Sequence, residues 1–152
     1  MAQTTLATTF KDAVIEISID NSSWTDISGV SNKVEISGGE REVSDTFTAG
    51  TDTPIVLSGR RASLDITSNI LWTADTAATD AEQIVRAAYE AATSFYIRWM
   101  PKGELSGTAL YTSTGVGVVT TPMYGFGDAA SADPMLIEFT SKVPYITAST
   151  VA

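Results

Sequence analysis

Residues 79–92, TDAEQIVRAAYEAA, are the one stretch of the chain with a clear helical period. At about 100° per residue, the apolar residues fall within a single stripe and the polar residues lie opposite. The stripe contains Ala81, Ile84, Val85, Ala88, Tyr89 and Ala92, and the polar side contains Glu82, Gln83, Arg86 and Glu90. A helix with one apolar face needs another layer to cover it. We therefore expect a single helix that packs against a sheet.

The sequence also indicates how this helix begins. Thr79 and Glu82 match a capping box, in which each side chain accepts a hydrogen bond from a main-chain amide of the first turn. Glu82 and Arg86 are four residues apart, which is the spacing of a favourable ion pair on a helix. We expect the helix to begin at Thr79, with this ion pair on its solvent side.

Nearly all the other segments alternate between apolar and polar residues with a period of two, as half-buried strands do. In the longest, residues 60–73, Ile66 and Ile70 share one face and Asp65 lies on the other. The remaining candidate strands are residues 14–20, 24–27, 33–37, 95–100, 109–121 and 135–146. Seven or eight strands in 152 residues predict one mainly β domain, a β-sandwich or partial barrel flanked by the helix at 79–92.

The ends of the chain and its turn residues add further expectations. Residues 1–11 are polar and predict an extended arm, with a frayed terminus as the alternative. Residues 147–152 predict a short, loose tail. Pro144 favours an edge position for the last strand, because proline cannot donate a hydrogen bond to a neighbouring strand. Gly115 and Gly117 interrupt an extended stretch, which indicates a bulge or the close approach of another backbone.

Residues 38–54 offer little beyond Val43 and Phe47 for burial. They contain four acidic residues and one basic residue, which is a net charge of −3. A compact domain rarely keeps a loop of this length without a use, and its first part alternates like a strand. We predict a projecting hairpin that turns near residues 49–52, after which residues 55–57 lead back into the body. The alternative is a mobile surface loop without a partner. The expected contact residues are Glu40, Arg41, Glu42, Asp45, Phe47 and Asp52.

The composition excludes several classes of site. The chain has 9 basic and 18 acidic residues, a formal net charge of −9, and neither cysteine nor histidine. Tight nucleic-acid binding would need a basic stripe. Disulfides, thiolate nucleophiles, histidine bases and Cys/His zinc sites need residues that the chain lacks. The first ten residues do not resemble a signal peptide. The sequence also lacks the run of at least 18 apolar residues that would predict a membrane-spanning helix.

Residues 125–130, GFGDAA, match a loose dinucleotide-binding fingerprint. The context fails, because Pro122 precedes them, no βαβ unit surrounds them and Pro134 follows closely. A glycoside hydrolase would need a defined pair of carboxylates, and acidic residues scattered over many strands form such pairs by chance. The aromatic residues expected in the core, not on a sugar-binding surface, are Trp24, Trp72 and Trp99. We expect no catalytic residue, no metal site and no cofactor.

Several segments taken together resemble a family of viral structural proteins. They are IDNSSWTDISGVSNKVEISGGEREV (19–43), GRRASLDIT (59–67), the single helix, FYIRWMPKG (95–103) and EFTSKVPYIT (138–147). This order resembles the major tail tube proteins of long-tailed bacteriophages, whose fold is shared with type VI secretion tube proteins. The resemblance extends from about Val14 to Thr147, and its most distinctive motif is SWTDI, residues 23–27.

The resemblance implies a two-sheet sandwich that assembles into hexameric rings, which stack into a tube. One sheet of each subunit would line the lumen, and the loop at 38–54 would reach the neighbouring ring. The implied partners are other copies of the chain, the tape measure, the tail terminator, baseplate or tip proteins, and double-stranded DNA that passes without specific binding. The implied location is the phage tail of the virion, after synthesis in the host cytoplasm. No enzymatic activity is implied.

Polar strand faces are the expected wall of this lumen, because an acidic wall repels phosphates and lets DNA slide. The lumen-facing candidates are Asp65, Thr67, Asn69 and Glu138. The candidates for contact with a neighbouring subunit are Arg60 and Arg61, with Ala87 and Ala91 on the helix as further possibilities. An ordinary exposed position is the alternative for each of them.

A second class of function stays open at this point. A β-sandwich on a virion can also serve as a binding or adhesion module for a carbohydrate or a cell-surface protein. An exposed cluster of tryptophans would favour this module. A hydrolase with two acidic residues is a third and weaker alternative.

Overall fold

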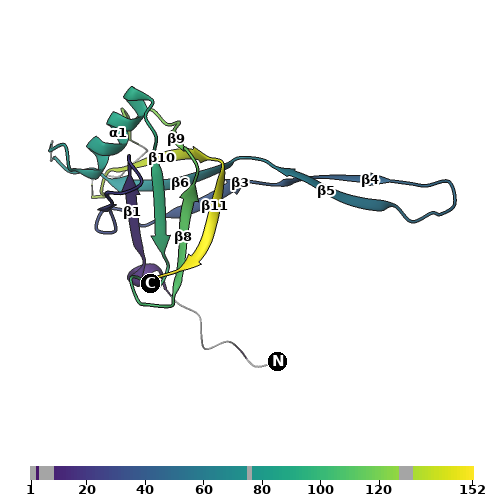
Figure 1. The fold of residues 1–152 in the computed structure, drawn as a ribbon. Helices are drawn as coiled ribbons and strands as arrows, with labels where there is room; N and C mark the ends of the chain where they lie inside the picture. The colour runs from purple at the N-terminus through teal and green to yellow at the C-terminus, as the bar shows by residue number, and fades with distance from the viewer. Residues whose placement is uncertain (1–2, 4–8, 75–76, 127–131) are drawn as a thin grey trace.

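The computed structural model describes residue 3 and residues 9–74, 77–126 and 132–152. These residues form eleven strands, one α-helix and one short 3₁₀ helix (Figure 1). The helices are η1 (Phe10–Asp12) and α1 (Ala81–Ala91). The strands are β1 (Val14–Ser18), β2 (Thr25–Asp26), β3 (Val34–Gly38), β4 (Arg41–Thr46), β5 (Ile55–Arg61), β6 (Leu64–Leu71), β7 (Tyr96–Met100), β8 (Ala109–Thr114), β9 (Val118–Val119), β10 (Leu136–Val143) and β11 (Tyr145–Thr150).

Nine strands form two antiparallel sheets. Sheet A has the order β11-β8-β7-β1-β2, and sheet B has the order β3-β6-β10-β9. The strands β4 and β5 form a separate two-stranded sheet. The predicted mainly β fold with one flanking helix is confirmed. The predicted number of strands is too low, because three predicted strands (60–73, 109–121 and 135–146) each contain parts of two observed strands.

The core lies between the two sheets and beneath α1. Its apolar side chains come from the period-two pattern, and Ile17, Ile66 and Phe139 are fully buried. Phe95 meets Phe139 edge to face, with ring centroids 5.9 Å apart. Burial of each such side chain contributes about 1.5–3 kcal/mol, so the core determines which face of each strand points inward.

Helix α1 covers one end of the sandwich (Figure 1), and its apolar stripe contributes Val85 and Ala88 to the core. The predicted capping box is wrong. The helix begins at Ala81, with Asp80 as the N-cap residue, and no side chain makes a capping hydrogen bond. Because the N-cap is Asp80 and not Thr79, Glu82 is the second residue of the helix and not the third, the position from which a side chain accepts a hydrogen bond from the N-cap amide.

The ion pair between Glu82 and Arg86 is confirmed. It does not lie on the solvent side, however, because Glu82 is only 2% exposed. The Arg86 guanidinium also donates two hydrogen bonds, each of 3.2 Å, to the main-chain oxygen of Met123. The pair therefore fastens the helix to the loop after β9.

The predicted strand at residues 60–73 is two strands with different partners. β5 pairs with β4 outside the sandwich, and β6 pairs with β3 and β10 inside it. Residues 55–57 do not lead back into the body, as the sequence suggested, because they belong to β5. The alternation of apolar and polar residues continues across the break, so the pattern did not reveal it.

The predicted last strand also changes partners, at Pro144. β10 lies between β6 and β9 in sheet B, and β11 pairs with β8 in sheet A. The predicted edge position holds for β11, which follows Pro144 at the edge of sheet A, and is wrong for β10. The prediction of a loose tail is wrong, because residues 147–150 pair with residues 109–112. Pro144 is tolerated at the corner between the strands, where neither ladder needs its amide.

The predicted close approach at Gly115 and Gly117 is confirmed. A Cβ on Gly117 would lie 2.7 Å from the main-chain oxygen of Phe95, and one on Gly115 would lie 2.8 Å from the Pro144 ring. The Phe95 amide donates a 2.9 Å hydrogen bond to the Gly117 oxygen. Because these glycines have no side chain, the segment between β8 of sheet A and β9 of sheet B can lie against Phe95 and Pro144.

Two sequence predictions lie largely outside the described residues. The N-terminal arm at 1–11 includes residues 1–2 and 4–8, and its last two residues belong to η1. The dinucleotide-like run at 125–130 includes residues 127–130. Within the ranges that the structure describes, no helix is long and apolar enough to span a membrane.

Candidate assembly surfaces

The hairpin formed by β4 and β5, here called the arm (residues 41–61), projects from the sandwich (Figure 1). A hairpin is present where the sequence predicted one, although it extends beyond Pro54 because β5 belongs to it. Its large apolar side chains are exposed: Val43 (66%), Phe47 (61%), Ile55 (48%), Val56 (63%) and Leu57 (59%). Soluble monomers rarely leave so many apolar side chains uncovered in one place.

Both faces of the arm carry these apolar side chains. The register of the ladder places Val43 and Val56 on one face. It places Ile55 and Leu57 on the other. A two-stranded hairpin by itself is at best marginally stable in water. The arm therefore presents apolar surface for burial against another molecule on two sides.

Main-chain hydrogen bonds connect the arm to the body. The ladder of β3 and β6 continues outward, with Gly39 donating to the Ser63 oxygen (3.0 Å) and Ala62 donating to the Glu40 oxygen (2.9 Å). Gly38 adopts φ = +76° at this junction, where a Cβ would lie 2.9 Å from the Ser63 oxygen. The arm is thus an extension of two strands of sheet B.

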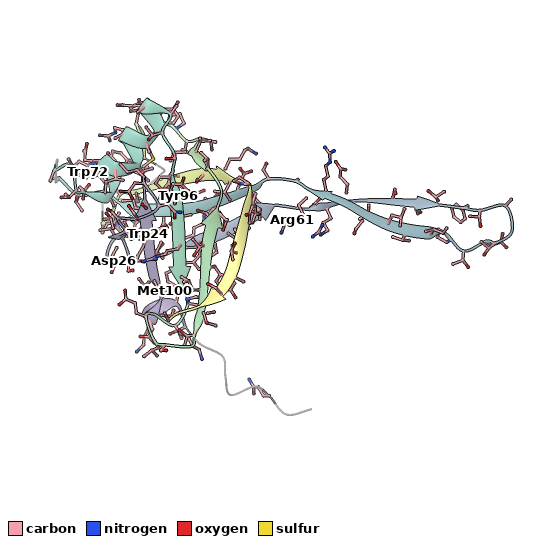
Figure 2. The ribbon with its side chains drawn as sticks, in the orientation of Figure 1. Trp24, Asp26, Arg61, Trp72, Tyr96 and Met100 are labelled. Atoms are coloured by element: carbon pink, nitrogen blue, oxygen red, sulfur yellow. The ribbon has the colours of Figure 1, made fainter. Side chains whose placement is uncertain are left out.

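Three arginines lie at the base of the arm. Arg41 donates to a main-chain oxygen of β5 (3.3 Å), and Arg61 lies over the Tyr145 ring, 5.3 Å from its centroid. Arg60 is exposed, and Figure 2 shows Arg61 where the arm meets the body. Residues 38–61 contain four acidic and three basic residues, a net charge of −1. The predicted net charge of −3 for residues 38–54 overstates the acidity of the hairpin. The hairpin continues to Arg60 and Arg61 of β5, which lie beyond that range.

The expected contact residues are distributed along the arm. Those at the base are Glu40, Arg41 and Glu42, and those farther out are Asp45, Phe47 and Asp52. All six are exposed, and their contact with a partner stays a prediction. Sequence reasoning missed Ile55, Val56 and Leu57 as surface residues. Their apolar run was visible, but an apolar run ordinarily indicates the core.

The outward face of sheet B, here called the polar face, is the second candidate surface. The ladder places Glu138 opposite Asn69 and Lys142 opposite Asp65. Thr67 and Thr140 lie between these pairs, with their hydroxyl oxygens 3.1 Å apart. The charged side chains and threonines of this face include Lys33, Glu35, Asp65, Thr67, Glu138, Thr140 and Lys142. The sequence identified the face but omitted its lysines.

Both lysines of the polar face pair with carboxylates. Lys33 Nζ lies 2.8 Å from Glu138 and 3.5 Å from Glu35, and Lys142 Nζ lies 3.5 Å from Asp65. The hydrogen bond to Glu138 raises the pKa of Lys33. Three carboxylates and two lysines give the face a net charge of −1, so it is less acidic than expected.

Asn69 must be removed from the predicted lumen set. It is only 7% exposed, because the segment around Asn32 covers it. Its amide nitrogen donates to Asn32 Oδ1 (2.7 Å), and its oxygen accepts a hydrogen bond from the Asn32 main chain (3.1 Å). An asparagine whose donors and acceptors are used in this way stabilises the loop before β3.

Sheet B also has two open edges. β3 is its last strand on one side and β9 on the other. The outward main-chain groups of an edge strand can pair with a strand of another chain. β3 is the longer of the two edges, with five residues.

The polar side of β1 is covered and not open to solvent. Glu16, on this side, is 8% exposed and forms an ion pair with Arg98 of β7. The Arg98 guanidinium lies over the Trp24 ring, 4.2 Å from its centroid. Trp24 therefore covers an ion pair on the surface of sheet A and does not enter the core, which corrects one of the three tryptophan predictions.

The tryptophans lie in separate places. Trp72 and Trp99 pack against the core, as predicted. Their aromatic partners are Phe126 and Tyr111, respectively. Each tryptophan is partly buried, so the described residues contain no exposed tryptophan cluster of the kind that a carbohydrate-binding module would use. The same residues contain no group of acidic side chains arranged to hold a metal ion.

The chain is similar to known proteins in structure and not in sequence. No protein-family model matches the chain, and no curated protein is similar to it in sequence. Solved structures match over nearly the whole length. The chain has the fold of phage-like tail proteins. A chain from the baseplate of the anti-feeding prophage has a TM-score of 0.68 at 13% identity, covering 98% of this chain and 99% of that one.

Two further structures agree. A chain from the virion of a native gene transfer agent particle has a TM-score of 0.62 at 15% identity, covering 96% of this chain and 100% of that one. A chain from the extended sheath–tube complex of an extracellular contractile injection system has a TM-score of 0.61 at 13% identity, covering 97% and 94%. At these identities the likeness establishes the fold.

Proposed function

We propose that this chain is a non-enzymatic structural subunit of a phage-like tail, whose copies form stacked, hexameric rings that build the tail tube. The observation that carries the proposal is the arm, with apolar side chains on both faces and no cover from its own chain in the described structure. Such a surface is stable when other subunits bury it. The fold, shared with proteins of tail-like particles, supports the same conclusion.

Ring closure would use the open edges of sheet B. The edge β3 of one subunit would pair with the β9 side of the next, which removes both edges. Sheets joined in this way form a closed barrel. Because the inner face of sheet B is occupied by the core, its polar face would line the lumen, with Asp65, Thr67 and Glu138 on the wall.

The ion pairs of the polar face suit a channel for DNA. A free lysine would attract phosphates, and phosphate contacts are the main source of affinity for DNA. Lys33 and Lys142 are each held by a carboxylate, so neither is free to do so. DNA would then pass through a weakly negative lumen without being retained.

This lumen can be tested by removing the carboxylates. In assembled tubes, the combination of Glu35→Gln, Glu138→Gln and Asp65→Asn should leave both lysines unpaired and increase the amount of DNA that the tubes bind at low salt. The increase should disappear at high salt. Unchanged DNA binding at low salt would show that the polar face does not face the lumen.

The remaining proposals name the partners of the chain and its location. The partners would be the tape measure, the tail terminator and baseplate or tip proteins, and the location would be the virion, after synthesis in the host cytoplasm. The coarse placement in a tail-like particle rests on the shared fold.

Electron microscopy of the concentrated protein tests the assembly. The wild-type chain should form sixfold rings or tubes, alone or when preformed tail tips are added as templates. A matched variant replaces residues 41–61 with an Asn-Gly turn between Glu40 and Ala62, which already share a hydrogen bond. It should keep the circular dichroism of the folded body and form no tubes. Wild-type protein that stays monomeric on templates would contradict the proposal.

A further inference from the structure

We propose that the outer part of the arm docks into an apolar pocket beside helix α1 of another copy of the chain. The inference deepens the proposed self-assembly and rests on it, because it names the surface that receives the arm. It is argued from three observations: the lining of the pocket, the chemistry of the arm, and the positions of both on the molecule.

The pocket lies along the outer side of α1. It has a volume of about 410 Å³ and is open to solvent. Its lining includes Ile19, Gln83, Ile84, Ala87, Ala91 and Thr93, and it contains no charged residue. Ile19 follows β1 and is 52% exposed, although its side chain is entirely apolar. The small alanine side chains leave the hollow, and Ile19 and Ile84 supply apolar walls.

The outer part of the arm matches this lining in charge. Residues 46–57, TFTAGTDTPIVL, contain a single charged residue, Asp52. Burial of an unpaired charge is costly, so an uncharged pocket accepts only an uncharged surface. The arm is charged mainly at its base, where Glu40, Arg41 and Glu42 lie. Its outer part is therefore the segment that suits the pocket.

Phe47 is the side chain that fits best. It is the largest apolar residue of the arm and is 61% exposed. An apolar cavity of about 150 Å³ is large enough for a benzene molecule. The pocket beside α1 is larger, so it accommodates the Phe47 ring together with an aliphatic side chain from the same face of the arm, such as Val56.

The arm cannot fill the pocket of its own chain. Figure 1 shows α1 at one end of the sandwich and the arm projecting from the opposite end. Ten residues from Arg41 to Gly50, at about 3.4 Å each, give the arm a reach of about 30 Å, directed away from α1. Docking must therefore occur between copies, head to tail. A heterologous contact of this kind propagates from subunit to subunit, as the stacking of rings requires.

A second hollow offers a rival site. It has a volume of about 150 Å³ and is lined by Gly29, Val30, Ser31, Asn32, Leu71 and Leu136. It lies at the end of β6 that is farther from the arm. It is smaller, and Ser31 and Asn32 contribute polar groups to it. We therefore assign the arm to the pocket beside α1 and use the rival as the comparison in the experiment.

Disulfide trapping tests the assignment directly, because the chain contains no cysteine. A tagged Phe47→Cys variant is mixed with untagged Ala87→Cys, assembled into tubes and mildly oxidised. A parallel mixture uses Leu136→Cys in place of Ala87→Cys. The covalent dimer of tagged and untagged chains should form with Ala87→Cys and not with Leu136→Cys. Tubes that give the opposite pattern, or no mixed dimer with Ala87→Cys, overturn the docking site while the proposed function stands.

A filled pocket provides the second measurement. Ala87→Arg places a long charged side chain in the pocket at an exposed helix position, where arginine costs the helix little. It should raise the concentration needed for assembly roughly tenfold or more, and leave the unfolding temperature of the monomer unchanged. Ser106→Arg, on an exposed loop outside the pocket, is the charge-matched control and should assemble normally.

Equal assembly of the Ala87→Arg and Ser106→Arg variants would overturn the inference. If the wild-type chain forms no tubes on templates, the proposed function itself fails.

Discussion

The apolar side chains of the body and those of the arm have opposite burial. In the body, Ile17 and Phe139 are completely buried. In the arm, Val43, Phe47 and Val56 are each more than 60% exposed. Both regions are antiparallel β-structure, so secondary structure does not explain the difference. The body contains its own second layer, and the arm has none within the described part of the chain. The proposed assembly accounts for this difference, because another copy would supply the missing layer.

The two regions should differ most in how far the removal of an aromatic ring lowers the free energy of unfolding. Phe139→Ala removes a buried ring that packs on Phe95, and should lower the free energy of unfolding of the monomer by about 3–5 kcal/mol. Phe47→Ala removes an exposed ring and should change it by less than about 0.5 kcal/mol. Urea unfolding of the two variants measures this. Similar losses would mean that the arm packs on its own body in solution.

The junction between the regions should be the next most sensitive place. Gly38→Ala puts a Cβ 2.9 Å from the Ser63 oxygen at a residue with φ = +76°. It should destabilise the chain by about 1–2 kcal/mol in thermal unfolding. Gly50→Ala, at the end of the arm with open space around it, is the control and should change the stability by less than about 0.5 kcal/mol. A larger effect at Gly50 than at Gly38 would contradict this account of the junction.

The helix of the body ends with a local strain that a substitution can relieve. Ala92, the C-cap of α1, has φ = +50° and ψ = 36°, the left-handed conformation that favours glycine. Ala92→Gly should stabilise the chain by about 0.5–1 kcal/mol. Ala91→Gly, one residue earlier within the helix, should destabilise it by a similar amount. Thermal unfolding of the pair checks the opposite signs, and a loss of stability in Ala92→Gly would show that this conformation is not present.

The smallest expected effect concerns the turn after β1. Asp20 accepts hydrogen bonds from the amides of Ser22 (2.9 Å) and Ser23 (2.8 Å), which hold the pKa of Asp20 far below its usual range. A lowered pKa stabilises the fold above about pH 4, and this contribution is lost as the pH falls further. Asp20→Asn should therefore unfold at a lower temperature than wild type at pH 7. The two unfolding temperatures should begin to converge below about pH 4, and a constant difference down to pH 3 would exclude this role.

The sequence predicts the parts of the fold that depend on local periodicity. The stripe from Ala81 to Ala92 identified the helix, and the alternation around Ile66 identified the inward face of β6. These patterns work because burial selects one face of a helix or strand along its whole length. The close approach at Gly117 was also predictable, because only glycine leaves room for it.

The sequence does not predict where a strand changes partners. The breaks at Ala62 and at Pro144 leave the alternation intact, so β5 was joined to β6 and β11 was taken for a loose tail. Pairing between strands depends on residues far apart in the chain, and no local pattern records it. The same reason explains why Glu82 and Asn69 were expected on the surface: the loops that bury them come from elsewhere in the sequence.

The candidate site was only partly predictable for a related reason. The charged residues of the arm and the polar face were identified, because polar side chains in a strand pattern indicate a surface. The apolar run at residues 55–57 was assigned to the body, because exposed and buried apolar residues have the same sequence signal. Lys33 and Lys142 of the polar face were missed, although they determine how its carboxylates are paired.

Hydrogen exchange on monomers and on assembled tubes tests the central claim most directly. In the monomer, the amides of β4 and β5 should exchange much faster than those of β6 and β10, because only one partner strand and no second layer protect them. In tubes, the largest gain in protection should occur in residues 41–61, with a second gain in residues 83–91 along the pocket. Tubes whose arm exchanges as fast as the arm of the monomer would contradict the claim that another copy covers it.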